Sequence, residues 1–195
     1  YILENFNVGA VIDNGAPIYS AGGLGRIYGN IIRDRNMRRI IVRDGDEIAS
    51  FPSAKISILN PAENEALSGD ENENSVVMKI ACGGNSILLC GDIDDKVMSR
   101  LSAYGNFLRS DIVKVPHHGG DAGDEEIVRN FFGHVRPKIS VISVGRNNRY
   151  NMPSKKTLAI LEELNCRAYQ TKIDGAVIIY LEDGSLRVKN PVRNN

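Results

Sequence analysis

The chain has 195 residues, with 42% hydrophobic and 25% charged side chains, which is the composition of a folded globular protein with a substantial core. Its 24 Lys and Arg residues balance 24 Asp and Glu residues, so the zero net charge excludes a bulk electrostatic attraction to nucleic acid. There is no run of about 18 apolar residues and no basic start followed by an apolar stretch, so we expect neither a transmembrane helix nor a signal peptide in these residues.

The first half of the chain predicts short strands and one clear helix. Residues 1–6 are typical of a helix end, and "VGAVID" predicts a buried strand that closes at an Asn-Gly turn. Isoleucines at helical spacing predict a helix in the second half of "YSAGGLGRIYGNIIRDR". "RRIIVRDGDEIASF" predicts a hairpin that turns at Asp44-Gly45. The next segments are a strand, "AKISILNP", and a polar loop over residues 63–74.

The second half has a more regular pattern. "SVVMKIACGGNSILLCGD" predicts a hairpin across a Gly-Gly-Asn turn, and "DDKVMSRLSAYG" predicts an amphipathic helix that begins at Asp94 and stops at Gly105. The remaining predicted elements are a strand at 111–116, a helix at 124–135, a strand at 138–145, a helix capped by Ser154, and strands at 167–171, 175–183 and 185–189, the last two joined at Asp183-Gly184. Alternating strands and helices beside hairpins predict α/β layers around mixed sheets, in one unit spanning residues 1–195.

The cysteines and basic clusters carry little functional signal. Cys82, Cys90 and Cys166 are odd in number and form no CxxC pair, so they predict neither a disulfide framework nor a zinc knuckle. We expect Cys82 and Cys90 to be buried, because both lie in apolar runs. The arginines of "RDRNMRRIIVR" are interpreted as a solvated face, whereas "GRNNRYNMPSKK" remains open to a functional role.

Polar groups follow three of the predicted strands. Asp92 follows "SILLCG", His117 and His118 follow "DIVKVP", and "GRNNRY" follows "KISVIS". Sites in layered α/β folds are built at this edge, where loops approach one another, and carboxylate with imidazole is a ligand set for zinc or manganese. Taken alone, Asp92 would be a turn residue capping the next helix, and the histidines would cap their strand. The metal hypothesis therefore depends on their joint placement.

Several segments in order carry a family resemblance. "ENENSVVMKIACGGNSILLCGDID", "SDIVKVPHHGGDAGDEEIV" and "RPKISVISVGRNNRYNMPSKKTLAILEELNCRAYQTKIDGAVII" resemble the metallo-β-lactamase-fold domain of bacterial competence proteins of the ComEC type, which take up DNA. The similarity runs from about Asn74 to Ile179, and more weakly through "ILENFNVGAVIDNG" and "RDGDEI". The resemblance implies an αββα sandwich with two divalent metal ions, zinc or manganese, along one edge, and hydrolase activity.

The resemblance also implies roles for individual residues. Asp92 matches the bridging aspartate, and the "PHHG" histidines match the late histidine ligand, so Asp92 and His118 are the expected catalytic residues. We expect His118 to be the ligand and His117 to support it, an order that adjacent loop residues leave open. On the substrate side, amide and guanidinium donors could hold a phosphate, with loop structure as the alternative. These expected substrate residues are Asn147, Asn148, Arg149 and Tyr150.

The chain also departs from the family pattern. The HxHxDH motif, which supplies most metal ligands in the family, is absent, so we expect a C-terminal portion of the sandwich, truncated at its N-terminus, with an incomplete metal site. Gly120 stands where relatives commonly have serine, and Met152 stands where they often have histidine before proline. Such a truncated sandwich is also expected to expose sheet edges.

The resulting hypotheses differ in class. The first is a metal-dependent phosphodiesterase or nuclease domain that acts on DNA during uptake. The second keeps the fold but takes a smaller phosphoester, and the third is a degenerate, non-catalytic binding module. Competence relatives carry this domain on a membrane protein outside the cytoplasm, so the resemblance implies membrane attachment through other parts of a larger protein. The residues themselves leave a cytoplasmic location open.

Overall fold

The computed structural model describes most of the chain. The described residues are 1–17, 23–51, 53–63, 67, 69–121, 123–182 and 184–190. The predicted loop at 63–74 and the predicted turn at Asp183 lie partly outside these ranges.

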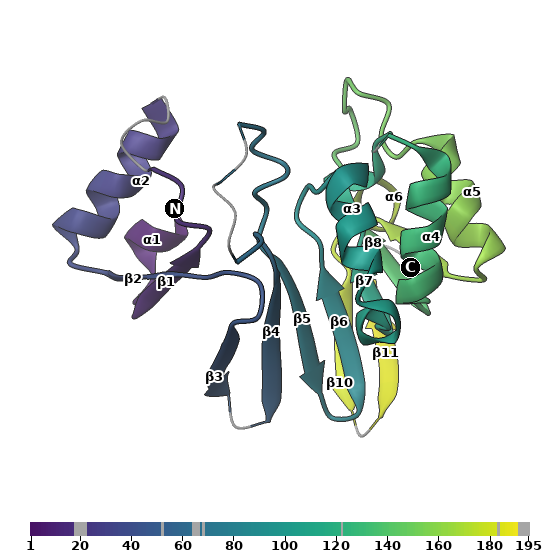
Figure 1. Cartoon of the computed structure of the whole chain (residues 1–195), viewed down its shortest axis with the longest axis horizontal. Coiled ribbons are helices and arrows are strands. Elements are labelled where there is room, and N and C mark those ends of the chain that lie inside the picture. The colour runs from purple at the N-terminus through teal and green to yellow at the C-terminus, as the bar shows by residue number, and fades with distance from the viewer. Residues whose placement is uncertain are drawn as a thin grey trace.

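A seven-stranded mixed sheet forms the centre of the molecule (Figure 1). Its strands lie side by side in chain order: β3 (Glu47–Phe51), β4 (Ala54–Asn60), β5 (Val77–Cys82), β6 (Asn85–Leu89), β7 (Ile112–Lys114), β8 (Ile139–Ile142) and β9 (Arg167–Gln170). The pairs from β3 to β6 are antiparallel, because short turns join them. The pairs from β6 to β9 are parallel, because helical crossovers join them.

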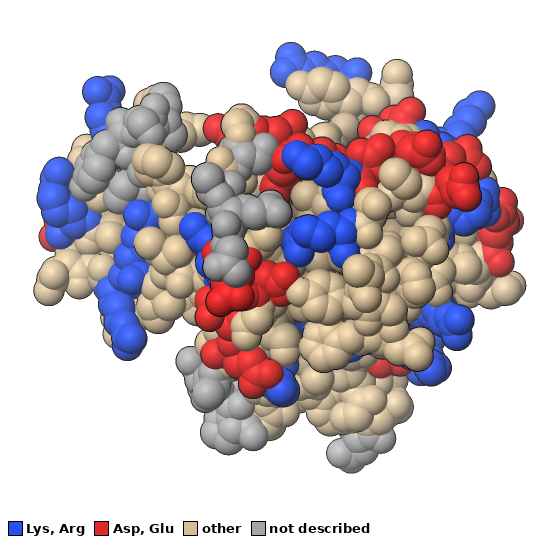
Figure 2. All heavy atoms as spheres, viewed as in Figure 1, with Lys and Arg blue, Asp and Glu red and all other residues tan. Residues whose placement is uncertain are grey.

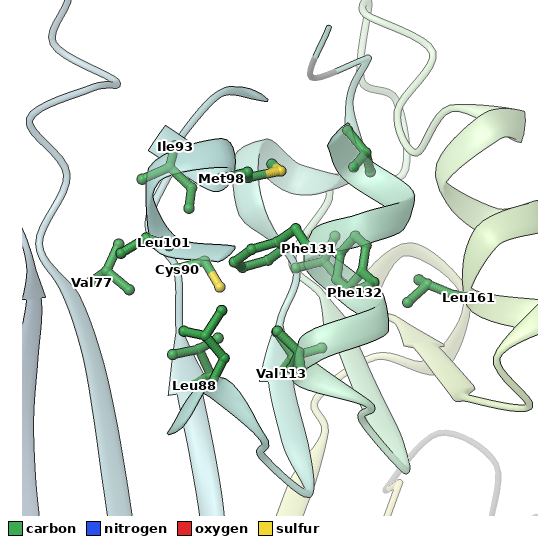
Figure 3. Packing of buried hydrophobic residues seen from close by; sticks show 14 of the residues in the cluster. Val77, Leu88, Cys90, Ile93, Met98, Leu101, Val113, Phe131, Phe132 and Leu161 are labelled. Atoms are coloured by element: carbon green, nitrogen blue, oxygen red, sulfur yellow. The ribbon is translucent and has the colours of Figure 1, made fainter. Parts of the chain in front are cut away.

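Three helices cover one face of this sheet: α3 (Asp95–Ser102), α4 (Glu125–Val135) and α5 (Lys155–Glu163). Their apolar stripes pack on strand residues such as Leu88 and Val113, which are fully buried. Phe131 and Phe132 lie at the middle of this core, with ring centroids 5.4 Å apart in an edge-to-face arrangement (Figure 3). This layer holds the carboxyl ends of β6, β7 and β8 in fixed positions.

The opposite face of the sheet is covered by a hairpin. Strands β10 (Ile178–Glu182) and β11 (Ser185–Lys189) pair with each other and pack on Ile112, Ile139 and Tyr169. Ile112 and Val113 are neighbours in β7 yet belong to different cores, because side chains alternate across a strand. The sheet is therefore buried on both faces in this half, which explains why its parallel strands are continuous apolar runs.

The N-terminal segment forms a separate two-stranded sheet accompanied by two helices. It contains α1 (Ile2–Asn5), β1 (Ala10–Asp13), α2 (Gly23–Asp34) and β2 (Arg38–Ile41), and β1 pairs with β2 in parallel. Asp13 joins these elements, since its carboxylate accepts hydrogen bonds from Tyr28 Oη at 2.6 Å and from Arg39 Nε at 2.7 Å. Burial raises the pKa of Asp13, but the hydrogen bonds from Arg39, Tyr28 and the Gly15 amide outweigh it and hold this pKa below its usual value.

Two predictions about the first half are wrong in detail. The predicted hairpin at 38–51 does not form: β2 pairs with β1, and β3 pairs with β4. The predicted turn instead bonds to the end of β4, where the Asp44 and Gly45 amides donate to the Pro61 and Ile58 carbonyls at 2.7 and 3.1 Å. Cys82 is only partly buried, because it ends its strand, whereas Cys90 and Cys166 are buried.

Short helices interrupt the regular pattern. They are the 3-10 turns η1 (Gly105–Leu108) and η2 (Pro116–Gly119), and the α-helical turn α6 (Thr171–Asp174).

Among the described residues, no helix combines the length and apolar character needed to cross a bilayer. The predicted mixed α/β layering is thus observed, with helices on one face of a large mixed sheet.

Candidate metal-binding site

The candidate site lies at the carboxyl ends of three adjacent parallel strands. Asp92 follows β6, the histidine pair follows β7, and the loop over residues 143–154 follows β8. The register aligns Leu89 with Lys114 and Lys114 with Val141, so the segments that leave these strands start side by side. The sheet geometry therefore brings together groups that are far apart in sequence.

The two histidines have a backbone conformation that non-glycine residues rarely adopt. His117 has φ 46° and ψ 41°, and His118 has φ 54° and ψ 21°, so both lie in the left-handed region. Each such residue costs about 1–2 kcal/mol relative to a right-handed one. Strain of this kind persists only where surrounding contacts enforce it, and it concentrates at functional sites. A strand cap would not require this conformation.

Hydrogen bonds from three directions hold the strained segment in place. The His117 amide donates to the Gly91 carbonyl at 3.3 Å, and the Gly120 amide donates to the His117 carbonyl at 2.8 Å. From the start of α5, the Ser154 amide donates to the Gly119 carbonyl at 2.7 Å. Gly119 itself has φ +74°, and a Cβ there would lie 2.7 Å from the Pro153 Cβ, so this position requires glycine.

The His118 ring is oriented by a backbone carbonyl. Its Nδ1 lies 2.6 Å from the Ser143 carbonyl oxygen at the end of β8. A carbonyl can only accept, so Nδ1 carries a proton in this contact and Nε2 of the neutral ring keeps its lone pair. Nε2 lies 3.5 Å from Asp92 Oδ2. The same arrangement orients histidine ligands in many metal sites.

The Asp92 carboxylate is shared between His118 and a lysine. While Oδ2 faces His118, Oδ1 lies 3.2 Å from Lys114 Nζ, which also donates to the Gly91 carbonyl at 2.8 Å. The Asp92 amide donates to Ser75 Oγ at 3.0 Å, which fixes the backbone at the start of the loop. Lys114 thus holds one carboxylate oxygen and leaves the other beside the imidazole.

The Asp92 and His118 side chains are spaced like two ligands of one metal ion. Ligand atoms about 2.0–2.2 Å from a tetrahedral ion lie roughly 3.4 Å from each other, close to the observed separation of Oδ2 and Nε2. Metal sites in proteins normally take three or four protein ligands. Within the described ranges, no group of three or more His, Cys, Asp and Glu side chains is placed to hold a metal ion. The described residues therefore supply two of the three or four ligands that such a site normally takes.

Acidic side chains surround this edge of the sheet. Asp94 caps α3 and Asp124 caps α4, and each helix has further carboxylates in its first turn, Asp95 in α3 and Glu125 and Glu126 in α4. Figure 2 shows the resulting concentration of acidic residues over the upper right of the molecule, above α3 and α4. Such an edge attracts cations and repels phosphate unless cations are bound.

The predicted substrate residues lie in the loop after β8, with different roles in the structure. Asn148 fixes the loop: its side-chain amide donates to the Gly145 and Met152 carbonyls at 3.2 and 3.0 Å, and its oxygen accepts from the Met152 amide at 2.7 Å. This leaves Asn148 no free N–H for a phosphate. Asn147, Arg149 and Tyr150 are exposed.

Sequence reasoning missed two groups at the site, Lys114 and Ser75. A lysine in the otherwise apolar run "DIVKVP" was the available signal for Lys114. Ser75 offered none, because its role depends on the start of β5 lying beside the end of β6. The two departures from the family pattern, Gly120 and Met152, prove to be neighbours: a Cβ at Gly120 would lie 2.9 Å from the Met152 methyl carbon.

Comparisons with known proteins place this chain in a family. No protein-family model matches the chain. It is 30% identical over 138 residues to ComE operon protein 3 of Bacillus subtilis, covering 70% of this chain and 17% of that protein. It is 27% identical over 132 residues to competence protein ComA of Neisseria gonorrhoeae, covering 67% of this chain and 18% of that protein. The chain thus spans less than a fifth of the length of these relatives.

The fold also has a counterpart among solved structures. A crystal structure of a candidate metal-dependent hydrolase from Parabacteroides distasonis superimposes with a TM-score of 0.50 at 15% identity, covering 84% of this chain and 64% of that chain. At this identity the likeness shows the fold alone. The resemblance and the fold class predicted from the sequence are confirmed. The chain is a homologue of the ComEC-type competence proteins and has a metallo-β-lactamase-like α/β fold.

Proposed function

We propose that this chain contributes one side of a dinuclear, metal-dependent phosphodiesterase site that acts on DNA. The observation that carries the proposal is the Asp92–His118 pair, in which Oδ2 and Nε2 lie 3.5 Å apart on a backbone held in a strained conformation. A carboxylate and an imidazole in this relation are suited to zinc or manganese. In the family that the sequence resembles, an aspartate and a histidine at these positions are metal ligands.

The proposal requires ligands beyond those described. We infer that, in a longer natural protein, an HxHxDH segment supplies them, since the matched relatives are several times longer than this chain. When bound, such ions supply Lewis acidity toward the phosphodiester. Asp92 and His118 would hold them, while Lys114 and the Ser143 carbonyl keep these two side chains oriented. The acidic side chains at the starts of α3 and α4 fit this proposal, because they favour binding of cations before a phosphate approaches.

DNA is proposed as the substrate on two grounds. Two of the matched relatives are named competence protein ComA, of Neisseria gonorrhoeae, and recombination protein 2, of Haemophilus influenzae. Arg149 and Tyr150 place a guanidinium and an exposed aromatic ring on the loop beside the site, and these groups suit phosphate and base. By the same resemblance, the natural protein would be attached to a membrane through other parts, with this domain outside the cytoplasm.

Metal content and hydrolysis test the proposal together. The protein carrying its native upstream segment is loaded with Zn²⁺ or Mn²⁺, and bound metal is measured by mass spectrometry alongside cleavage of a labelled oligonucleotide. We expect two metal ions per chain, and loss of both metal and cleavage in His118→Ala. His134→Ala is the matched control, because His134 lies in the last turn of α4, near the amino end of β7.

A non-catalytic binding module is the second candidate. It is favoured by Met152, whose side chain packs against the hydrophobic core at a position where relatives often have histidine. If the metal-replete protein with its upstream segment binds no metal, the phosphodiesterase proposal is wrong and the binding module remains. Metal binding with cleavage of small phosphoesters but not of DNA would instead support a hydrolase with another substrate.

A further inference from the structure

A cavity of about 460 Å³ opens beside the Asp92–His118 pair. Its wall is formed by the segments that follow β7, β8 and β9, and includes His118, Val144, Tyr150, Met152 and Thr171. The volume lies within the range of small-molecule sites. Because His118 belongs both to this wall and to the candidate metal ligands, a molecule in the cavity would lie next to the proposed reaction centre.

The polar groups of the wall are already occupied by the protein. Thr171 Oγ1 accepts from the Val144 amide at 2.7 Å and donates to the Val144 carbonyl at 2.9 Å. The Asn148 amide is bonded within its own loop, and the Ser143 carbonyl accepts from His118. The wall therefore presents mainly apolar surface, which suits a flat, weakly hydrated group better than a sugar or a phosphate.

An aromatic ring and a cation stand at the mouth of this cavity. Tyr150 is 65% exposed, so its ring is accessible to a ligand. The Arg149 guanidinium lies 5.1 Å from the Tyr150 ring centre and donates to its hydroxyl at 3.0 Å. An exposed aromatic ring with an adjacent arginine is the combination that binds bases and backbone of single-stranded nucleic acids.

We propose that this cavity binds one unpaired nucleobase, which stacks on Tyr150 while Arg149 contacts the adjacent phosphate. The inference takes its substrate, DNA, from the proposed function. It adds which form of DNA the site selects. A base can enter the cavity only when it is unpaired and unstacked, so the site selects single strands or frayed ends over intact duplex. The base would be read by shape and stacking, because the wall has few free hydrogen-bonding groups, and the preference among bases is accordingly weak.

Binding without metal tests this inference separately from catalysis. Fluorescence anisotropy in EDTA compares a labelled oligodeoxythymidylate with an oligomer of equal length made of abasic deoxyribose units. We expect the oligodeoxythymidylate to bind roughly 5- to 100-fold more tightly, in line with the effect of one base–aromatic stack. Tyr150→Ala should remove this preference, and Tyr150→Phe should keep it, since the ring is retained.

The control is Tyr104→Ala, because Tyr104 is 37% exposed but follows the carboxyl end of α3, away from the cavity. It should leave both affinities unchanged. Equal affinities of the wild type for the two oligomers, no binding of either, or a preference that survives Tyr150→Ala would each overturn the nucleobase site. This binding experiment contains no metal, so its outcome is independent of the metal and cleavage experiment. If the protein prefers oligodeoxythymidylate to the abasic oligomer but neither binds metal nor cleaves DNA, the phosphodiesterase proposal is wrong and the nucleobase site stands.

Discussion

Substitution of Gly120 by alanine tests the packing behind the histidine pair. Gly120 has φ −62° and ψ 178°, a conformation open to any residue, so alanine introduces no backbone strain. Its Cβ would lie 2.9 Å from Met152 Cε and 3.1 Å from the His117 carbonyl oxygen. The Met152 methyl is the end of a flexible side chain and can move, whereas the carbonyl is held by its hydrogen bond from the Gly120 amide.

The magnitude follows from these two contacts. Overpacking of a well-filled core costs typically about 1–3 kcal/mol. Since one of the two neighbours can yield, we expect Gly120→Ala to lower the free energy of unfolding by about 1–2 kcal/mol. Gly119→Ala should cost more, about 3 kcal/mol, because a left-handed φ adds to a contact of 2.7 Å with a rigid proline ring.

A double-mutant cycle separates the Met152 contact from the carbonyl contact. Urea unfolding is measured for Gly120→Ala, Met152→Ala and the double variant. If the Met152 methyl fills the space of the missing Cβ, the double variant should be more stable than the sum of the single effects predicts, by about 0.5 kcal/mol or more. Additive effects to within about 0.3 kcal/mol would refute this account of why the two departures from the family pattern occur together.

Three further outcomes are expected. Burial raises the pKa of Asp13, but its hydrogen bonds outweigh burial and hold the pKa below its usual value, so its contribution to stability is complete above about pH 4 and is lost as pH falls through the folded pKa. Asp13→Asn should therefore flatten the pH dependence of the urea midpoint below about pH 4. Phe131→Ala should cost about 3–5 kcal/mol in the same assay, because Phe131 is fully buried. Lys114→Met should cost only about 1 kcal/mol, since its ion pair is partly exposed, and a loss above about 3 kcal/mol would contradict this reading of the site.

Local chemistry made the second half of the fold predictable. The helices predicted at Asp94, Asp124 and Ser154 are present, because each of these side chains accepts a hydrogen bond from an amide of the first turn. The hairpin at Gly83-Gly84 is present as well, since both glycines adopt the positive φ that its turn requires. Caps and turns are decided within a few residues, so they can be inferred from a single sequence.

Long-range pairing and loop contacts were less predictable. The partner of β2 is β1 rather than β3, and nothing within "RRIIVRDGDEIASF" distinguishes these pairings, since both strands suit either partner. The meeting of Asp92 with His118 could be expected, because it follows from parallel neighbouring strands. The role of Asn148 could not, because its hydrogen bonds depend on the path of the backbone in its own loop.

The order of strands in the central sheet bears on how the site is assembled. Each strand from β4 to β9 pairs with the strand that precedes it in the chain, so the sheet can grow in the direction of synthesis with short loop closures. His118 lies 26 residues after Asp92, so the pair can meet as soon as β7 has docked on β6. The two candidate ligands are thus a local product of folding, and the remaining strands lock a contact that can already exist during translation.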